Sequence, residues 1–61
     1  MNKLKSRREE LNLTQKQVAE RIGIKEQQYQ FYEYGKTIPN VIIGIRLAEA
    51  LQTTVEALYK A

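Results

Sequence analysis

Residues 14–23 read TQKQVAERIG, and this stretch decides the fold. Thr14 and Gln17 form a capping box, in which the Thr14 hydroxyl accepts a hydrogen bond from the Gln17 amide and the Gln17 side chain reaches back. Gly23 can take the left-handed conformation that closes a helix without a Cβ clash. The stretch therefore predicts a short helix with a defined start and a defined end.

The helix of residues 14–23 is the second in the chain. A third helix is predicted directly after it, over about 25–34, and it ends at Gly35. Its buried side is formed by Ile24, Tyr29 and Tyr32. Two short helices joined by so tight a turn cannot lie antiparallel. They must cross steeply, as in a helix-turn-helix.

Helical spacing of apolar residues continues on both sides of this pair. A first helix is predicted over residues 2–11, a fourth over 41–51 with Asn40 as its N-cap, and a fifth from 55 to about 60. No four-residue stretch alternates well enough to indicate a strand. The predicted fold class is all-α, with five helices.

The composition excludes most chemistry. The chain has 61 residues and contains no His and no Cys, and its acids are all Glu. Without these residues an ordinary zinc site, a thiol nucleophile and an imidazole base near neutral pH are excluded. We expect one domain, residues 1–61, with no enzymatic activity, no metal and no cofactor. Its core is thin, because a chain of this size buries only about 60% of its unfolded surface.

The charge distribution points to a negatively charged partner. The formal net charge is +3, and the positive excess lies in the N-terminal two thirds of the chain. No apolar run approaches the ~20 residues that a membrane span needs. We expect a cytoplasmic protein with no membrane partner.

Further residues form a pattern that covers nearly the whole chain, and the pattern consists of Leu13-Thr14-Gln15, Ala19, Gly23, Glu33-x-Gly35-Lys36, Pro39, Leu47-Ala48-x-Ala50-Leu51, Thr54 and Leu58. This pattern resembles the XRE-type helix-turn-helix family, the DNA-binding domain of phage repressors and Cro proteins. The resemblance implies a five-helix repressor-like domain that is encoded by a bacterium or phage and acts on DNA.

Four residues have predicted structural roles. The small Ala19 lies where the third helix crosses closest, and Gly23 makes the turn. The resemblance also implies that Arg8 and Glu33 tie the first helix to the end of the recognition helix, residues 25–34.

The outer face of the third helix carries the predicted base contacts. A Gln amide matches the donor and acceptor of adenine in the major groove, which makes Gln27 and Gln30 the leading base readers. The resemblance places Glu26, Gln27 and Phe31 at base-contacting positions as well. Glu26 could accept from cytosine, and Phe31 could pack on a thymine methyl.

Other polar residues surround this face, and they are predicted to contact phosphates: Gln15, Lys16, Lys25, Tyr34, Lys36 and Asn40. The first of these lies at a helix N-terminus, where free amides attract an anion. Such contacts position a domain on DNA without selecting its sequence.

The fourth helix departs from the family pattern, because Gly44 replaces a usual Leu and two isoleucines precede it. Either Ile43 fills the space left at Gly44, or Ile42 or Ile43 lies in a contact between molecules. We expect a weak homodimer through the C-terminal helices, with Leu58 and Tyr59 as further interface candidates.

These observations predict a sequence-specific, double-stranded DNA-binding transcriptional regulator, a repressor that binds as a dimer. The alternative is a protein-interaction module of the same fold, such as an antitoxin or a regulatory subunit, whose main partner is another protein and whose DNA binding is weak.

Overall fold

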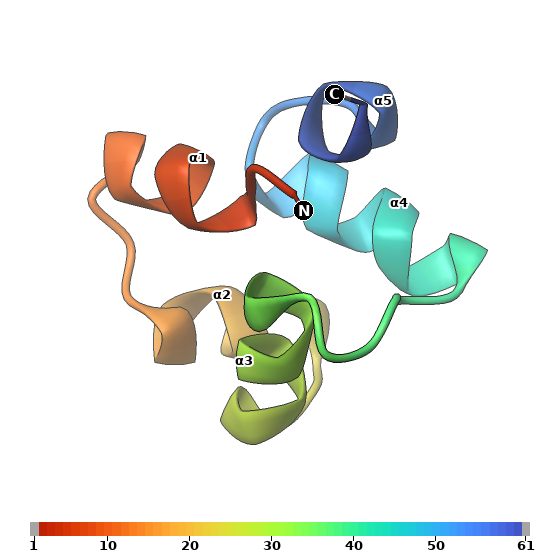
Figure 1. The fold of residues 1–61 in the computed structure, drawn as a ribbon. Coiled ribbons are helices and arrows are strands. Elements are labelled where there is room, and N and C mark those ends of the chain that lie inside the picture. Colours follow the sequence, from red (N-terminus) through yellow and green to blue (C-terminus); the bar gives the residue numbers. More distant parts are fainter. Residues whose placement is uncertain (1, 61) are drawn as a thin grey trace.

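The structure, a computed structural model, describes residues 2–60 and contains five α-helices and no strand within that range. The helices are α1 (Leu4–Glu10), α2 (Gln15–Ile22), α3 (Glu26–Tyr34), α4 (Val41–Ala50) and α5 (Val55–Tyr59), as Figure 1 shows. The all-α prediction is confirmed. Met1 and Ala61, which the predicted domain includes, lie outside the described residues. None of the helices in residues 2–60 is both long and apolar enough to span a membrane.

Side-chain caps begin three of the helices. At α2 the capping box is complete, with 3.0 Å between the Gln17 amide and the Thr14 hydroxyl and 2.8 Å between the Thr14 amide and Gln17 Oε1. Asn40 and Thr54 cap α4 and α5 with hydrogen bonds of 2.9 and 3.0 Å. Each such cap stabilises a helix by about 1 kcal/mol.

Two helices begin later than the spacing predicts. Asn2 stays outside α1, because its side-chain oxygen accepts from the Leu4 amide at 3.0 Å while its side-chain nitrogen donates to the Tyr32 carbonyl at 2.8 Å. Lys25 precedes α3 in an extended conformation, and its side chain makes no capping bond. The helices α4 and α5 each end one residue earlier than predicted.

The core receives side chains from all five helices. Its buried residues are Leu4, Val18, Ala19, Ile22, Tyr29, Tyr32, Leu47, Ala48, Leu51 and Leu58. The helix α2 packs against both α3 and α4, while α1 packs against α3 and α4 against α5. Since Tyr29 and Tyr32 hold one side of α3 in the core, the opposite side of this helix faces outward.

Gly44 is buried in α4, and Ile43 beside it packs partly against the core. A Cβ added at Gly44 would have Val55 Cγ2 as its nearest heavy atom, at 3.9 Å, which is an ordinary contact distance. Gly23 differs, because it has the left-handed φ of 75° that the α2 end requires.

We expect Gly44→Ala to raise the free energy of unfolding by about 0.5–1 kcal/mol, because it removes the entropic cost of glycine within a helix. The same change at Gly23 should lower it by about 1–2 kcal/mol, because Ala is strained at positive φ. Urea denaturation of the two variants tests both signs. A loss of stability in Gly44→Ala would contradict the packing described for α4.

Candidate nucleic-acid interface

The turn between α2 and α3 is held by the C-cap of α2 and by backbone hydrogen bonds. Gly23 takes the left-handed conformation with φ 75° and ψ 33°. Its amide donates to the Glu20 carbonyl at 3.3 Å, and the Ile24 amide donates to the Ala19 carbonyl at 3.0 Å. Ala19 itself is 1% exposed. Gly23 thus ends α2 in the left-handed conformation, and the carbonyl of the buried Ala19 accepts one of the bonds that close the turn.

The outward side of α3 is largely polar and open to solvent. Lys25, Glu26, Gln27, Gln28 and Tyr34 are exposed, whereas Gln30 and Phe31 are partly buried. Figure 1 shows α3 in the lower part of the view, with α5 at the opposite end of the molecule. An α-helix with a polar outer side in this position has the shape that the major groove of B-DNA admits.

Two of the predicted contact residues touch each other. The Lys36 ammonium lies 4.9 Å from the centroid of the Phe31 ring, within the range of a cation–π interaction. A hollow of about 380 Å³ lies beside this ring and is lined by Lys25, Gln27, Gln28, Phe31, Tyr32, Thr37 and Ile38. The ring thus forms part of the wall of a depression on the outward side of α3.

The glutamines of this region differ in how firmly they are held. Gln15 Nε2 donates to Glu33 Oε1 at 3.1 Å, and Gln15 Oε1 accepts from Gln30 Nε2, also at 3.1 Å. Gln28 Nε2 donates to the Tyr32 hydroxyl at 2.8 Å. Within residues 2–60 no hydrogen bond holds the side chain of Gln27.

The predicted phosphate contacts at the two helix starts are only partly available. The side chain of Gln15 is occupied by its two partners, although the amides of Gln15 and Lys16 in the first turn of α2 have no acceptor within the helix. The side-chain oxygen of Asn40 is occupied by its capping bond. Lys16 and Lys36 are exposed.

Arg8 and Glu33 form a buried, two-pronged ion pair. Arg8 Nε lies 2.9 Å from Glu33 Oε2 and Arg8 Nη2 lies 3.0 Å from Glu33 Oε1. Only 12% of the Arg8 side chain and 2% of the Glu33 side chain are exposed. Arg8 Nη1 also donates to the Leu13 carbonyl at 2.9 Å, before α2 begins. The pair thus ties α1, the start of α2 and α3 together.

Burial alone would raise the pKa of Glu33. The hydrogen bonds from Arg8, and then the one from Gln15, outweigh this effect and hold the pKa below its ordinary value. In turn, the Glu33 carboxylate raises the pKa of Arg8. Burial, and after it the neighbouring Glu33, raises the pKa of the Tyr29 hydroxyl. Glu33 is therefore charged at neutral pH.

Arg7 has a structural role that its sequence position did not indicate. Its guanidinium donates to the carbonyls of Leu51 and Gln52, at 2.8 and 3.0 Å, where α4 ends. Residues 3–8 form a basic segment, and two of its cations, Arg7 and Arg8, bind carbonyl and carboxylate oxygens of the protein itself. The partners of Arg7 lie more than forty positions away in the chain, so local spacing gave no signal.

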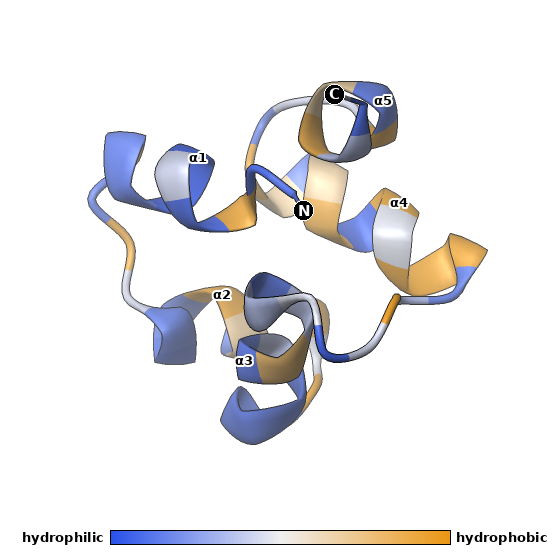
Figure 2. Ribbon diagram, in the orientation of Figure 1, coloured by the Kyte–Doolittle hydropathy of each residue, from blue (hydrophilic) through white to orange (hydrophobic). Residues whose placement is uncertain are grey.

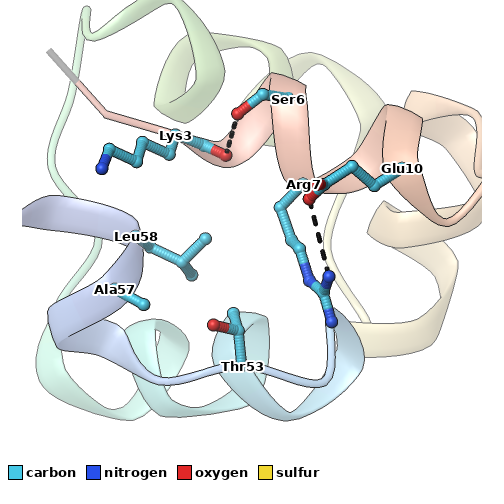
Figure 3. A pocket seen from close by; sticks show the side chains of 7 residues that line it. All are labelled: Lys3, Ser6, Arg7, Glu10, Thr53, Ala57 and Leu58. Atoms are coloured by element: carbon cyan, nitrogen blue, oxygen red, sulfur yellow. Dashed lines mark hydrogen bonds and ion pairs between the residues drawn. The ribbon is translucent and has the colours of Figure 1, made fainter.

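A separate hollow of about 430 Å³ lies between α1 and α5, lined by Lys3, Ser6, Arg7, Glu10, Thr53, Ala57 and Leu58 (Figure 3). The Arg7 side chain extends from α1 toward the segment before α5, and its Nη1 lies 3.5 Å from Glu10 Oε1 of the same helix. This hollow is remote from the outward side of α3. Within residues 2–60, no group of three or more acidic, His or Cys side chains is arranged to hold a metal ion.

The predicted interface residues of the C-terminal half are placed unequally. Ile42 is 60% exposed, whereas Leu58 is 2% exposed and belongs to the core. Ile43 and Tyr59 are partly buried against that core. Leu58 cannot contact a partner while the core is intact, because its side chain is almost fully covered by the core. Four further aliphatic residues are exposed and line one hollow, and they are Ile38, Val41, Ile45 and Val55.

A helix-turn-helix family model matches residues 4–58 of the chain. The chain belongs to the XRE-type helix-turn-helix family. This is a family of DNA-binding transcriptional regulators, and the predicted membership is confirmed.

Two relatives agree with this assignment. The chain is 34% identical over 56 residues to the cryptic phage CTXphi transcriptional repressor RstR of Vibrio cholerae, an alignment that covers 92% of the chain and 50% of the relative. It is 40% identical over 48 residues to an uncharacterised HTH-type transcriptional regulator of Methanothermobacter thermautotrophicus, covering 79% of the chain and 70% of that relative. The chain thus spans about half the length of the Vibrio relative.

We expect Glu33→Gln to lower the free energy of unfolding by about 1.5–3 kcal/mol, because the largely buried Arg8 loses its counter-charge. The double variant Arg8→Met with Glu33→Leu should lose much less, since it leaves no unpaired charge. Urea denaturation near neutral pH measures both. Equal losses in the two variants would contradict a role that depends on charge.

The same pair predicts a loss of stability in acid. Because folding depresses the Glu33 pKa, the stabilisation is complete above the unfolded value of about 4.3 and is lost as the pH falls through the folded value. Urea midpoints measured from neutral pH downward should therefore decline below about pH 4.3 in the natural chain. The decline should be smaller in the double variant.

Proposed function

We propose that the chain is a sequence-specific DNA-binding domain of a transcriptional repressor and that it places α3 in the major groove of double-stranded DNA. The observation that carries the proposal is the outward side of α3, which is largely polar and exposed and follows α2 after the short turn at Gly23. The name of the Vibrio relative, a transcriptional repressor, supports repression as the proposed regulatory effect.

Base recognition is assigned to the side chains on that outward side. Gln27 and Gln30 offer the paired donor and acceptor that adenine takes, and Glu26 can accept from cytosine. Phe31 packs on a thymine methyl once the groove edge reaches its ring. Contacts to the DNA phosphates are assigned to the side chains of Lys16, Lys25, Tyr34 and Lys36 and to the first-turn amides of α2. Gln15 and Asn40 contribute to these contacts through their backbone.

The size of the domain supports the proposal of a second copy on the same DNA. Half-sites read by such domains lie about 34 Å apart, one turn of DNA. The longest dimension across the Cα atoms is 25 Å, and side chains add about 3 Å at each surface. One domain therefore covers one half-site, and two domains on neighbouring half-sites come close to contact. We infer a weak homodimer on DNA.

We assign the dimer contact to the apolar face, defined here as Ile38, Val41, Ile42, Ile45 and Val55. Figure 2 shows hydrophobic residues gathered at the start of α4, directly after the loop that follows α3. The face borders a hollow of about 430 Å³ that includes Gly44 and Tyr59. Exposed apolar groups of this kind mark interaction surfaces. The same face favours the second candidate function, a module that binds another protein.

Two variants test the DNA proposal on duplexes selected from a random pool at near-physiological salt. Lys36→Ala should weaken binding to every sequence and lower the slope of log affinity against log salt by about one unit. Gln27→Ala should relax preference at one base pair and leave the salt slope unchanged. If no duplex is enriched and neither variant changes DNA affinity, the chain is not a specific DNA-binding domain.

The double variant Val41→Gln with Ile42→Gln tests the apolar face. Both side chains are more than half exposed, so the fold should be unaffected. We expect the affinity for a two-fold site to fall toward that for a single half-site, while half-site affinity is retained. Sedimentation of the protein with and without the duplex measures the stoichiometry. Unchanged two-fold binding would place the dimer contact elsewhere and assign the face to another protein.

A further inference from the structure

Four side chains from three helices form a continuous chain of hydrogen bonds that ends on the outward side of α3. Arg8 in α1 donates twice to Glu33 in α3, at 2.9 and 3.0 Å. Gln15 at the start of α2 donates to the same carboxylate at 3.1 Å, and Gln30 in α3 donates to Gln15 at 3.1 Å. The chain thus runs from a buried ion pair to a partly exposed amide.

The direction of each bond in this chain is set by the charge at its buried end. An ionised carboxylate can only accept hydrogen bonds, so Gln15 must turn its nitrogen toward Glu33. Its oxygen then points to Gln30, which must in turn present its own nitrogen. Glu33 is held charged by Arg8, with 2% of its side chain exposed. A carboxamide that could otherwise rotate by half a turn is thereby fixed.

We propose that Gln15 is a positioning residue that transmits the orientation set by Arg8 and Glu33 to the carboxamide of Gln30, and so decides which base pair Gln30 prefers. The proposal rests on the proposed DNA-binding function. The bond to Gln15 uses one hydrogen of the Gln30 nitrogen. The second hydrogen and the oxygen remain, and together they are the donor and acceptor pair that an adenine edge requires.

Gln27 provides the internal comparison. It lies on the same helix and is exposed, and within residues 2–60 no hydrogen bond fixes its carboxamide. A base contact by Gln27 should therefore be independent of residue 15. A base contact by Gln30 should depend on it.

The experiment uses Gln15→Met, which keeps the length of the side chain and removes both hydrogen bonds. Affinities are measured for the selected duplex and for duplexes that differ from it at one base pair. Gln30→Ala should reduce discrimination at one pair by about 5- to 150-fold. Gln15→Met should reduce discrimination at the same pair, and combining it with Gln30→Ala should add nothing. The salt slope should not change, because no charge is removed.

Gln15→Met with Gln27→Ala is the matched control, and in this pair the two losses should be independent and fall at different base pairs. An equal loss on every duplex after Gln15→Met would assign residue 15 to phosphate binding or to folding and would overturn the positioning role. Losses that add up in the variant of Gln15 and Gln30 would overturn it as well. If the pool yields no preferred duplex, the proposed function fails together with this inference, whereas a preferred duplex unaffected by Gln15→Met overturns the inference alone.

The free protein gives a second readout. The side-chain amide resonances of Gln30 should shift in Gln15→Met, and they should stay unchanged in Gln27→Ala. Unchanged Gln30 resonances in Gln15→Met would show that the two amides are not bonded in solution and would overturn the proposal without any DNA.

Discussion

The ion pair between Arg8 and Glu33 is the constraint on which the arrangement of the helices depends. It joins residues 25 positions apart, and the remaining nitrogen of Arg8 reaches the Leu13 carbonyl. A buried pair of this kind adds little stability over apolar residues of the same volume, yet removing one member is costly. Its contribution here is geometric. Directed bonds fix α1, the start of α2 and α3 at one set of angles, which an apolar contact of the same size would leave less defined.

The remainder of the fold reflects how little a chain of 61 residues can bury. Helix ends are therefore closed by individual side chains, with Thr14, Asn40 and Thr54 at three starts and Arg7 against the two carbonyls that follow α4. The helix α3 begins without a side-chain cap, because Lys25 cannot accept a hydrogen bond. Its first amides thus stay open on the side of the molecule assigned to DNA, where a phosphate oxygen could replace the missing cap.

Local structure was predictable from the sequence, whereas contacts between distant residues were not. The capping box at Thr14 and the stop at Gly23 depend on neighbours within four positions, so their residue types alone indicate them. Leu58 was expected at an interface, but it is a core residue, because apolar spacing marks a helix side without saying what covers it. The bonds of Gln15 to Glu33 and Gln30 could not be predicted, since polar residues at those positions are equally suited to solvent.

The inward direction of Arg7 and Arg8 bears on how the domain would search along DNA. Both lie within a basic segment whose composition predicts a strongly positive surface. Their guanidinium groups instead face carbonyls and a carboxylate. Lysines carry the outward charge of the candidate site, and at physiological salt their field fades beyond about 8 Å. If the domain binds DNA as proposed, DNA of random sequence would bind it weakly and release it quickly. Residence at the operator would then be governed by the short-range fit of α3, with competing genomic DNA sequestering little of the protein.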